Sequence, residues 1–170
     1  MGSKALISVS DKGDIVEFAK GLNSLGIGII ATDGTAKALT SEGIPVTKVT
    51  DITGFEVVLD GKIKTLHPAI HEKIMTADIE IVVVNLIPTD ASETALENID
   101  VGGVALIKSG IKSMKDVCVI VNKERYKGIL EELRKGGISS STRLEMAIEA
   151  SDYIISYELK VNEIIKGYLI

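Results

Sequence analysis

The sequence has few aromatic residues and no excess of positive charge. Phenylalanine, tyrosine and tryptophan together make up 4% of its 170 residues, and tryptophan is absent. Single-stranded nucleic acids stack their bases on exposed aromatic rings, so this composition argues against such a ligand. The formal net charge of −5 at pH 7 argues against general binding to a nucleic-acid backbone. A local basic site for one phosphate stays compatible with this balance.

Cysteine, histidine and long apolar runs are also scarce. The one cysteine, Cys118, cannot form a disulfide within the chain, and its apolar neighbours predict a buried strand position. His67 and His71 have no third ligand at a convincing spacing, so we predict no metal site. No apolar stretch approaches the ~20 residues of a membrane span, and the N-terminus lacks a signal-peptide pattern. We therefore expect a cytoplasmic protein with no membrane partner.

Aliphatic residues dominate the apolar share, and the balance of 45% hydrophobic to 25% charged residues is that of a globular protein. Short apolar segments alternate with segments of helical spacing, which predicts one α/β domain over residues 1–170 with a mostly parallel sheet and helices on both faces. The predicted strands cover 5–9, 27–31, 45–49, 79–86 and 117–121. The predicted helices cover 15–25, 36–43, 55–59, 93–98, 100–112, 123–134 and 142–166.

Small polar residues and glycine follow the first two predicted strands, at Ser8–Lys12 and Thr32–Thr35. In parallel sheets, ligands bind beyond the carboxyl ends of the strands. Hydroxyls, a lysine and free backbone N–H groups at a helix start together make an anion site. The alternative is that these residues only cap the helix. Two such turns follow neighbouring strands, which strengthens the case for a phosphate site. From these residues alone, phosphate binding and simple helix capping are both open.

Two further segments concentrate polar residues. Residues 62–68 place two lysines, a threonine and a histidine in one irregular loop, for which a solvated surface loop is the alternative. Asp100–Gly103 joins an acid to paired glycines at a helix start. Aspartate is a favoured cap there, while the glycines let a ligand approach the backbone closely. Lys108 and Lys112 lie four residues apart on one face of the following helix, and Lys112 could also be a surface residue.

Six segments, in family order and with family-like spacing, resemble the IMP cyclohydrolase domain of the bifunctional purine-biosynthesis enzyme AICAR transformylase/IMP cyclohydrolase. That domain has a methylglyoxal synthase-like, Rossmann-like fold, and the resemblance extends over nearly the whole chain. No segment resembles the transformylase half. The six segments are Ser8–Lys12, Gly34–Leu39, Thr53–Phe55, Lys64–Pro68, Val84–Leu86 and Ile99–Gly103.

The resemblance implies that the protein closes the purine ring of 5-formamidoimidazole-4-carboxamide ribotide to give IMP and water, without a cofactor. Catalysis is implied for Lys64, Asp100 and Lys112, with Asp100 taking a proton from the attacking amide and a lysine stabilising the oxyanion. Contacts with the reacting groups are also implied for Asn85 and Gly102, and Lys62 and Thr65 are further candidates for substrate binding. The implied phosphate-binding residues are Ser8, Ser10, Lys12, Thr32, Gly34 and Thr35.

The resemblance also implies a homodimer, and a separate AICAR transformylase as a possible partner. The sequence departs from the family where Ile87 replaces a tyrosine and Asp33 replaces a glycine. These departures keep a second hypothesis open, a non-catalytic nucleotide- or phosphate-binding regulator of the same fold. Methylglyoxal synthase itself is similar only at Thr32–Thr35.

Overall fold

Five parallel strands form the centre of the fold. The computed structural model describes residues 2–55, 63–89 and 96–168. The sheet has the order β3-β2-β1-β4-β5, and each neighbouring pair is parallel. The strand order therefore reverses between β1 and β4, which is where ligands bind in open parallel sheets. The strands are β1 (Lys4–Val9), β2 (Gly28–Ala31), β3 (Thr47–Lys48), β4 (Ile81–Asn85) and β5 (Cys118–Ile120).

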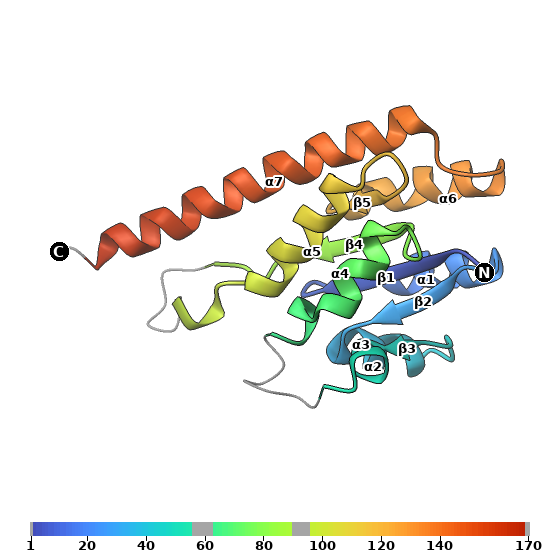
Figure 1. The fold of residues 1–170 in the computed structure, drawn as a ribbon, viewed down its shortest axis with the longest axis horizontal. Coiled ribbons are helices and arrows are strands. Elements are labelled where there is room, and N and C mark those ends of the chain that lie inside the picture. Colours follow the sequence, from blue (N-terminus) through green and yellow to red (C-terminus); the bar gives the residue numbers. More distant parts are fainter. Residues whose placement is uncertain (1, 56–62, 90–95, 169–170) are drawn as a thin grey trace.

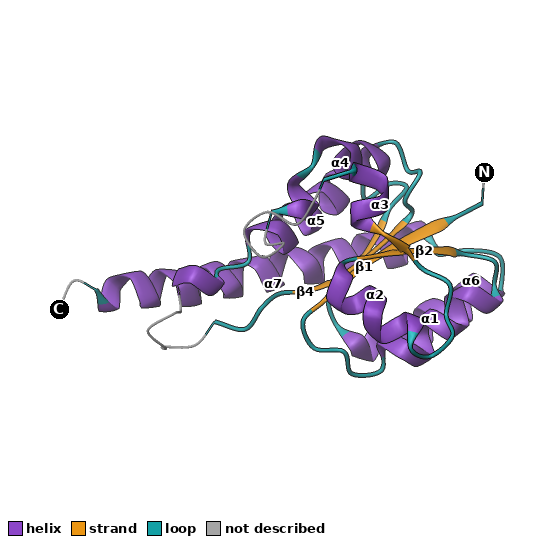
Figure 2. Ribbon diagram, turned by 90° about the horizontal axis from the view of Figure 1, so that it is seen from below, coloured by secondary structure: helices purple, strands orange, loops and turns teal. Residues whose placement is uncertain are grey.

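Helices cover both faces of this sheet (Figures 1 and 2). Figure 2 shows α1, α2 and α6 on one side of the strands and α3, α4 and α5 on the other. The long α7 packs with the second group and extends past the sheet at its C-terminal end (Figure 1). The helices are α1 (Ile15–Ser24), α2 (Asp33–Thr40), α3 (Val49–Thr53), α4 (Pro68–Met75), α5 (Val101–Lys112), α6 (Tyr126–Arg134) and α7 (Ser140–Gly167). Short 3₁₀ helices cover Lys64–Leu66, Leu96–Asn98 and Lys123–Arg125.

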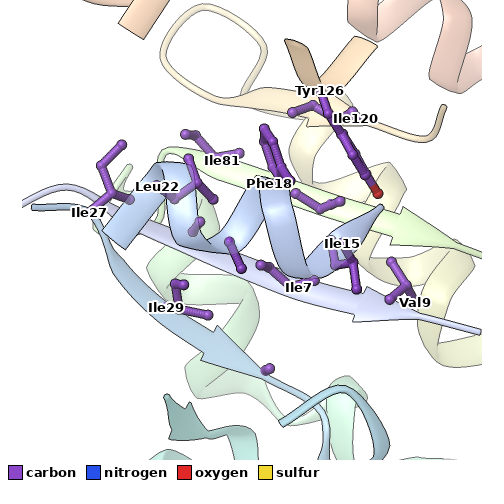
Figure 3. Close-up of a cluster of buried hydrophobic side chains, with 14 of the residues drawn as sticks. Ile7, Val9, Ile15, Phe18, Leu22, Ile27, Ile29, Ile81, Ile120 and Tyr126 are labelled. Atoms are coloured by element: carbon purple, nitrogen blue, oxygen red, sulfur yellow. The ribbon is translucent and has the colours of Figure 1, made fainter. Parts of the chain in front are cut away.

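Alternation along the strands divides the core into two clusters. Ile7 and its alternate neighbours face α1 and α6, where the Phe18 and Tyr126 rings stack with centroids 4.3 Å apart (Figure 3). Leu6 and Val82 face the other way, against α4, α5 and α7. Successive side chains of a strand point to opposite faces, so strands buried on both sides read as continuous apolar runs. This explains why the strands could be found from the sequence.

The α/β class and the parallel sheet are confirmed, whereas several element boundaries and several helices differ from the predictions. β3 is shorter than predicted because Val49 already begins α3, which the Asp51 carboxylate caps by accepting from the Lys48 N–H at 3.0 Å. α4 was not predicted at all. Phe55 is not helical, and the rest of the predicted helix 55–59 lies outside the described residues. The described part of the predicted helix 93–98 is only a 3₁₀ turn.

Within the described residues, no helix is both long and apolar enough to cross a membrane. The apolar residues of the longest helix, α7, are distributed around it and interrupted by charges.

Asp78 ties the start of β1 to the end of α4. Its carboxylate accepts from the Lys4 ammonium at 2.6 Å and from the Lys73 ammonium at 2.8 Å. These hydrogen bonds, first that from Lys4, lower the pKa of Asp78 to about 2. Because the folded state holds the carboxylate ionised, this contribution to stability is present above the unfolded pKa near 4 and is lost as pH falls through about 2.

We expect Asp78→Asn to lower the free energy of unfolding by roughly 1–2 kcal/mol at pH 7, a value discounted for solvent screening around this partly exposed group. The difference between wild type and variant should shrink below pH 4, be small at pH 2 and vanish below it. Urea unfolding of both proteins across this range measures it. A difference that persists undiminished at pH 2 would show that the charge of Asp78 is not its cause.

Candidate functional site

A cavity of about 200 Å³ opens at the carboxyl ends of β1, β2 and β4, beside the switch point of the sheet. The first turns of α2 and α5 and the 3₁₀ turn at Lys64–Leu66 complete its walls. Helix N-termini carry unpaired N–H groups and a partial positive charge, which suits an anionic ligand group. The lining residues are Ser8, Val9, Ser10, Thr32, Gly34, Lys64, Thr65, Asn85, Ile87, Glu97, Ile99, Asp100, Val101 and Gly103.

The start of α2 is fastened to β1 through hydroxyl groups. Thr35 is 1% exposed, and its hydroxyl donates to the Val9 carbonyl and accepts from the Val9 N–H, both at 3.3 Å. The Thr32 hydroxyl donates to it at 3.4 Å. Thr35, a predicted phosphate ligand, therefore uses its hydroxyl to connect α2 to β1 and does not line the cavity. Thr32 and Gly34 do line it.

Lys64 comes to the cavity from the 3₁₀ turn before α4. Its ammonium forms an ion pair with the carboxylate of Asp33, the first residue of α2. The Lys64 side chain is only 12% exposed, so this pair is shielded more than an ordinary surface salt bridge. An ammonium has three N–H donors, and one bond to Asp33 leaves others for a ligand.

Asn85, at the end of β4, holds the loop that follows β1. Its amide oxygen accepts from the Ser10 N–H at 2.5 Å and from the Asp11 N–H at 2.9 Å, and its amide nitrogen donates to the Asp11 carbonyl at 2.8 Å. This single side chain satisfies three backbone groups of a loop that no strand or helix pairs. The Asp11 carboxylate accepts from the Gly13 N–H at 2.9 Å, which with nearby Lys123 lowers the pKa of Asp11.

Asp100 is the N-cap of α5. One carboxylate oxygen accepts from the Gly103 N–H at 2.7 Å, and the other accepts from the Ile87 N–H at 3.2 Å. The backbone N–H of Asp100 donates to the Tyr157 hydroxyl at 2.7 Å, and the N–H of Leu86 donates to the Tyr153 hydroxyl at 3.0 Å. Two tyrosines of α7 thus hold the two loops that bear Ile87 and Asp100.

Gly103 packs closely against the side chains of Leu86 and Asp100 at this cap. A Cβ atom there would lie 2.6 Å from Leu86 Cδ2 and 2.8 Å from an Asp100 carboxylate oxygen. We expect Gly103→Ala to lower the free energy of unfolding by about 1–3 kcal/mol, as overpacking does elsewhere. In Gly128→Ala of α6, where nothing lies within 4 Å, the added Cβ should be neutral or stabilising by up to about 1 kcal/mol. Equal unfolding midpoints for the two variants would contradict this account.

The structure gathers eight of the predicted site residues around the cavity and leaves four others away from it. Lys112 is the last residue of α5, about 16 Å along the helix from Val101, and it does not line the cavity that Lys64 and Asp100 share. Lys12 is exposed, and its ammonium donates to the Ser10 carbonyl at 3.3 Å. Gly102, like Thr35, is buried behind the cavity wall, and Lys62 lies outside the described residues. The eight that line the cavity are Ser8, Ser10, Thr32, Gly34, Lys64, Thr65, Asn85 and Asp100.

Sequence reasoning missed several residues of the lining. Glu97 lies in the predicted helix 93–98 and Ile99 in the segment Ile99–Gly103 that resembles the family, but neither was assigned to the site. Ile87 was noticed only as a departure from the family, yet it lines the cavity. Among the described residues, no three histidine, cysteine, aspartate or glutamate side chains gather closely enough to hold a metal ion.

The parallel sheet defines an α/β protein, and its cavity lies at the switch point, where open parallel sheets bind their ligands. The family model of the MGS-like domain matches residues 14–105, more than half of the chain. The chain therefore belongs to the MGS-like domain family. It is similar to the crystal structure of ForH, with a TM-score of 0.86 and 28% sequence identity over 97% of this chain and 100% of the ForH chain.

Proposed function

We propose that this protein is a ring-closing enzyme of the IMP cyclohydrolase type, which acts on a formamido-imidazole-carboxamide nucleotide and releases water. One observation carries the proposal. Lys64 and Asp100, two residues to which the family resemblance assigns catalysis, line the same cavity although 36 positions separate them in the sequence. The hydroxyls of Ser8, Ser10 and Thr32 and the N-terminus of α2 surround the same space and suit a phosphate.

In the proposed reaction the carboxamide nitrogen attacks the formyl carbon of the same molecule. A C–N bond forms, the formyl oxygen becomes a hydroxyl on a tetrahedral carbon, and loss of water completes the ring. Both partners belong to one substrate, so holding the reactive conformer supplies much of the acceleration. Asp100 would accept the amide proton, since a carboxylate keeps acceptor capacity beside its two backbone N–H partners. Lys64 would stabilise the oxyanion and protonate the leaving oxygen.

A second candidate function is a non-catalytic nucleotide-binding regulator. Ile87 lies in the lining where the family has a tyrosine, both carboxylate oxygens of Asp100 serve as backbone caps, and Lys112 lies elsewhere. Two of the three residues expected to do chemistry, Asp100 and Lys112, thus have a structural role or lie outside the cavity, and the family tyrosine is replaced.

Incubation with 5-formamidoimidazole-4-carboxamide ribotide separates the two candidates. The purine absorbance of IMP should rise faster with the protein than in the uncatalysed control. Saturable binding of the formyl nucleotide without IMP formation above background would decide for the regulator.

Two partner expectations remain proposals. A homodimer finds support in α7, which exposes about half or more of each of the side chains of Leu144, Ile148, Ile155 and Leu159. A separate AICAR transformylase as supplier of the substrate follows from the proposed reaction alone.

A further inference from the structure

The charges of the cavity are unusual for a site that takes a phosphate. Among the described residues that line it, Lys64 is the one basic side chain, whereas Glu97 and Asp100 are acidic. Lys12, the other described lysine expected at the phosphate, directs its ammonium to the Ser10 carbonyl and stays exposed. A phosphate dianion would therefore depend on Lys64, on hydroxyl groups and on the N-terminus of α2.

Asp33 already interacts with two of these groups, Lys64 and the N-terminus of α2. It is the first residue of the eight-residue α2, so its carboxylate lies at the positive end of the helix. The same carboxylate is ion-paired with Lys64. Lys64 lines the cavity and its side chain is 12% exposed, whereas the side chain of Asp33 is 36% exposed and lies outside the lining.

We propose that Asp33 is a specificity-determining residue, which competes with the phosphate of the ligand for Lys64 and so limits the preference of the site for nucleotides over nucleosides. The inference rests on the proposed nucleotide site. A bound phosphate must draw Lys64 away from Asp33 or share it, and in either case it meets the charge of the carboxylate. An unphosphorylated ribose carries no charge, so the Asp33 carboxylate does not repel it. It also leaves the ion pair between Lys64 and Asp33 intact.

The consequence is that Asp33 lowers the affinity of the site for a phosphorylated ligand and so favours release of a phosphorylated product. Removal of the Asp33 charge frees the Lys64 ammonium for the phosphate, and this added charge-assisted contact should raise the affinity for a dianion about tenfold or more in a partly shielded site. The affinity for the corresponding nucleoside should stay the same. Most of the gain should need Lys64, because it arises when the lysine is freed from its partner.

Isothermal titration calorimetry with IMP and with inosine tests this inference on four proteins: wild type, Asp33→Asn, Lys64→Met and the double variant. We expect Asp33→Asn to bind IMP about tenfold or more tightly than wild type and inosine equally well. In the Lys64→Met background, the gain for IMP should be mostly lost. Asp116→Asn is the matched control, because it removes the same charge from an exposed position just before β5, at the opposite edge of the sheet.

Other outcomes separate the inference from the proposed function. Weaker or unchanged IMP binding by Asp33→Asn, with Lys64→Met impaired, would overturn the role of Asp33 and leave the site in place. IMP binding that responds to neither variant would place the nucleotide elsewhere and overturn both. Asp33→Ser, which keeps a residue favoured at helix starts, repeats the test if Asp33→Asn folds poorly.

Discussion

Lys64→Met should reduce the rate of ring closure by two to three orders of magnitude. Lys64 is the one basic side chain in the described lining of the cavity, so no neighbour there can take over stabilisation of the developing oxyanion. Loss of one donor to an oxyanion typically costs this much in kcat, equivalent to about 3–4 kcal/mol. Methionine keeps the length of the side chain and removes the charge. Steady-state kinetics by absorbance at saturating substrate measures the effect.

Lys112→Met is the matched control for this prediction. The same substitution at the far end of α5, on an exposed side chain, should leave kcat and the free energy of unfolding unchanged. If Lys112→Met slowed ring closure as much as Lys64→Met, Lys112 would have to reach the substrate, which contradicts the arrangement described for this chain.

Substitution of Asp100 should separate a structural role from a chemical one. Asp100→Ala removes the N-cap of α5 and the acceptor for the Ile87 N–H, so we expect a loss of about 1–2 kcal/mol in the free energy of unfolding together with the loss of activity. Asp100→Asn keeps one oxygen to accept from the Gly103 N–H and should retain most of the stability. It cannot take a proton, so ring closure should still fall by about 100-fold or more.

The comparison of the two Asp100 variants is decisive for its role. Urea unfolding gives the stability of each protein, and the rate of IMP formation gives its activity. An Asp100→Asn enzyme with near wild-type kcat would show that Asp100 acts only as a cap.

Hydrophobic patterning predicted the sheet and most helices, because each strand buries residues on both faces and reads as a continuous apolar run. It missed α4, since Pro68 looks like a helix breaker. Pro68 is instead the first residue of that helix, where its missing N–H costs nothing, and His67 caps it by accepting from the Ala69 N–H at 3.2 Å. His67 itself is extended, which is the conformation that a following proline favours.

The candidate site was predicted in its residue types and only partly in its geometry. Asp33 and Lys64 are 31 positions apart, and Asn85 is 75 positions from Ser10, so no local pattern could reveal these contacts. The resemblance grouped Lys112 with Lys64 and Asp100 because the three match the residue types at the family's catalytic positions. A helix that starts at the cavity carries its twelfth residue about 16 Å away, and this geometry separates Lys112 from the others.

A crystal structure of the protein with IMP bound tests the central claim most directly. The account predicts the phosphate among Ser8, Ser10 and the N-terminus of α2, within reach of the Lys64 ammonium, and the purine ring beside Asp100. Electron density for IMP at another surface, or a purine ring remote from both Lys64 and Asp100, would contradict it.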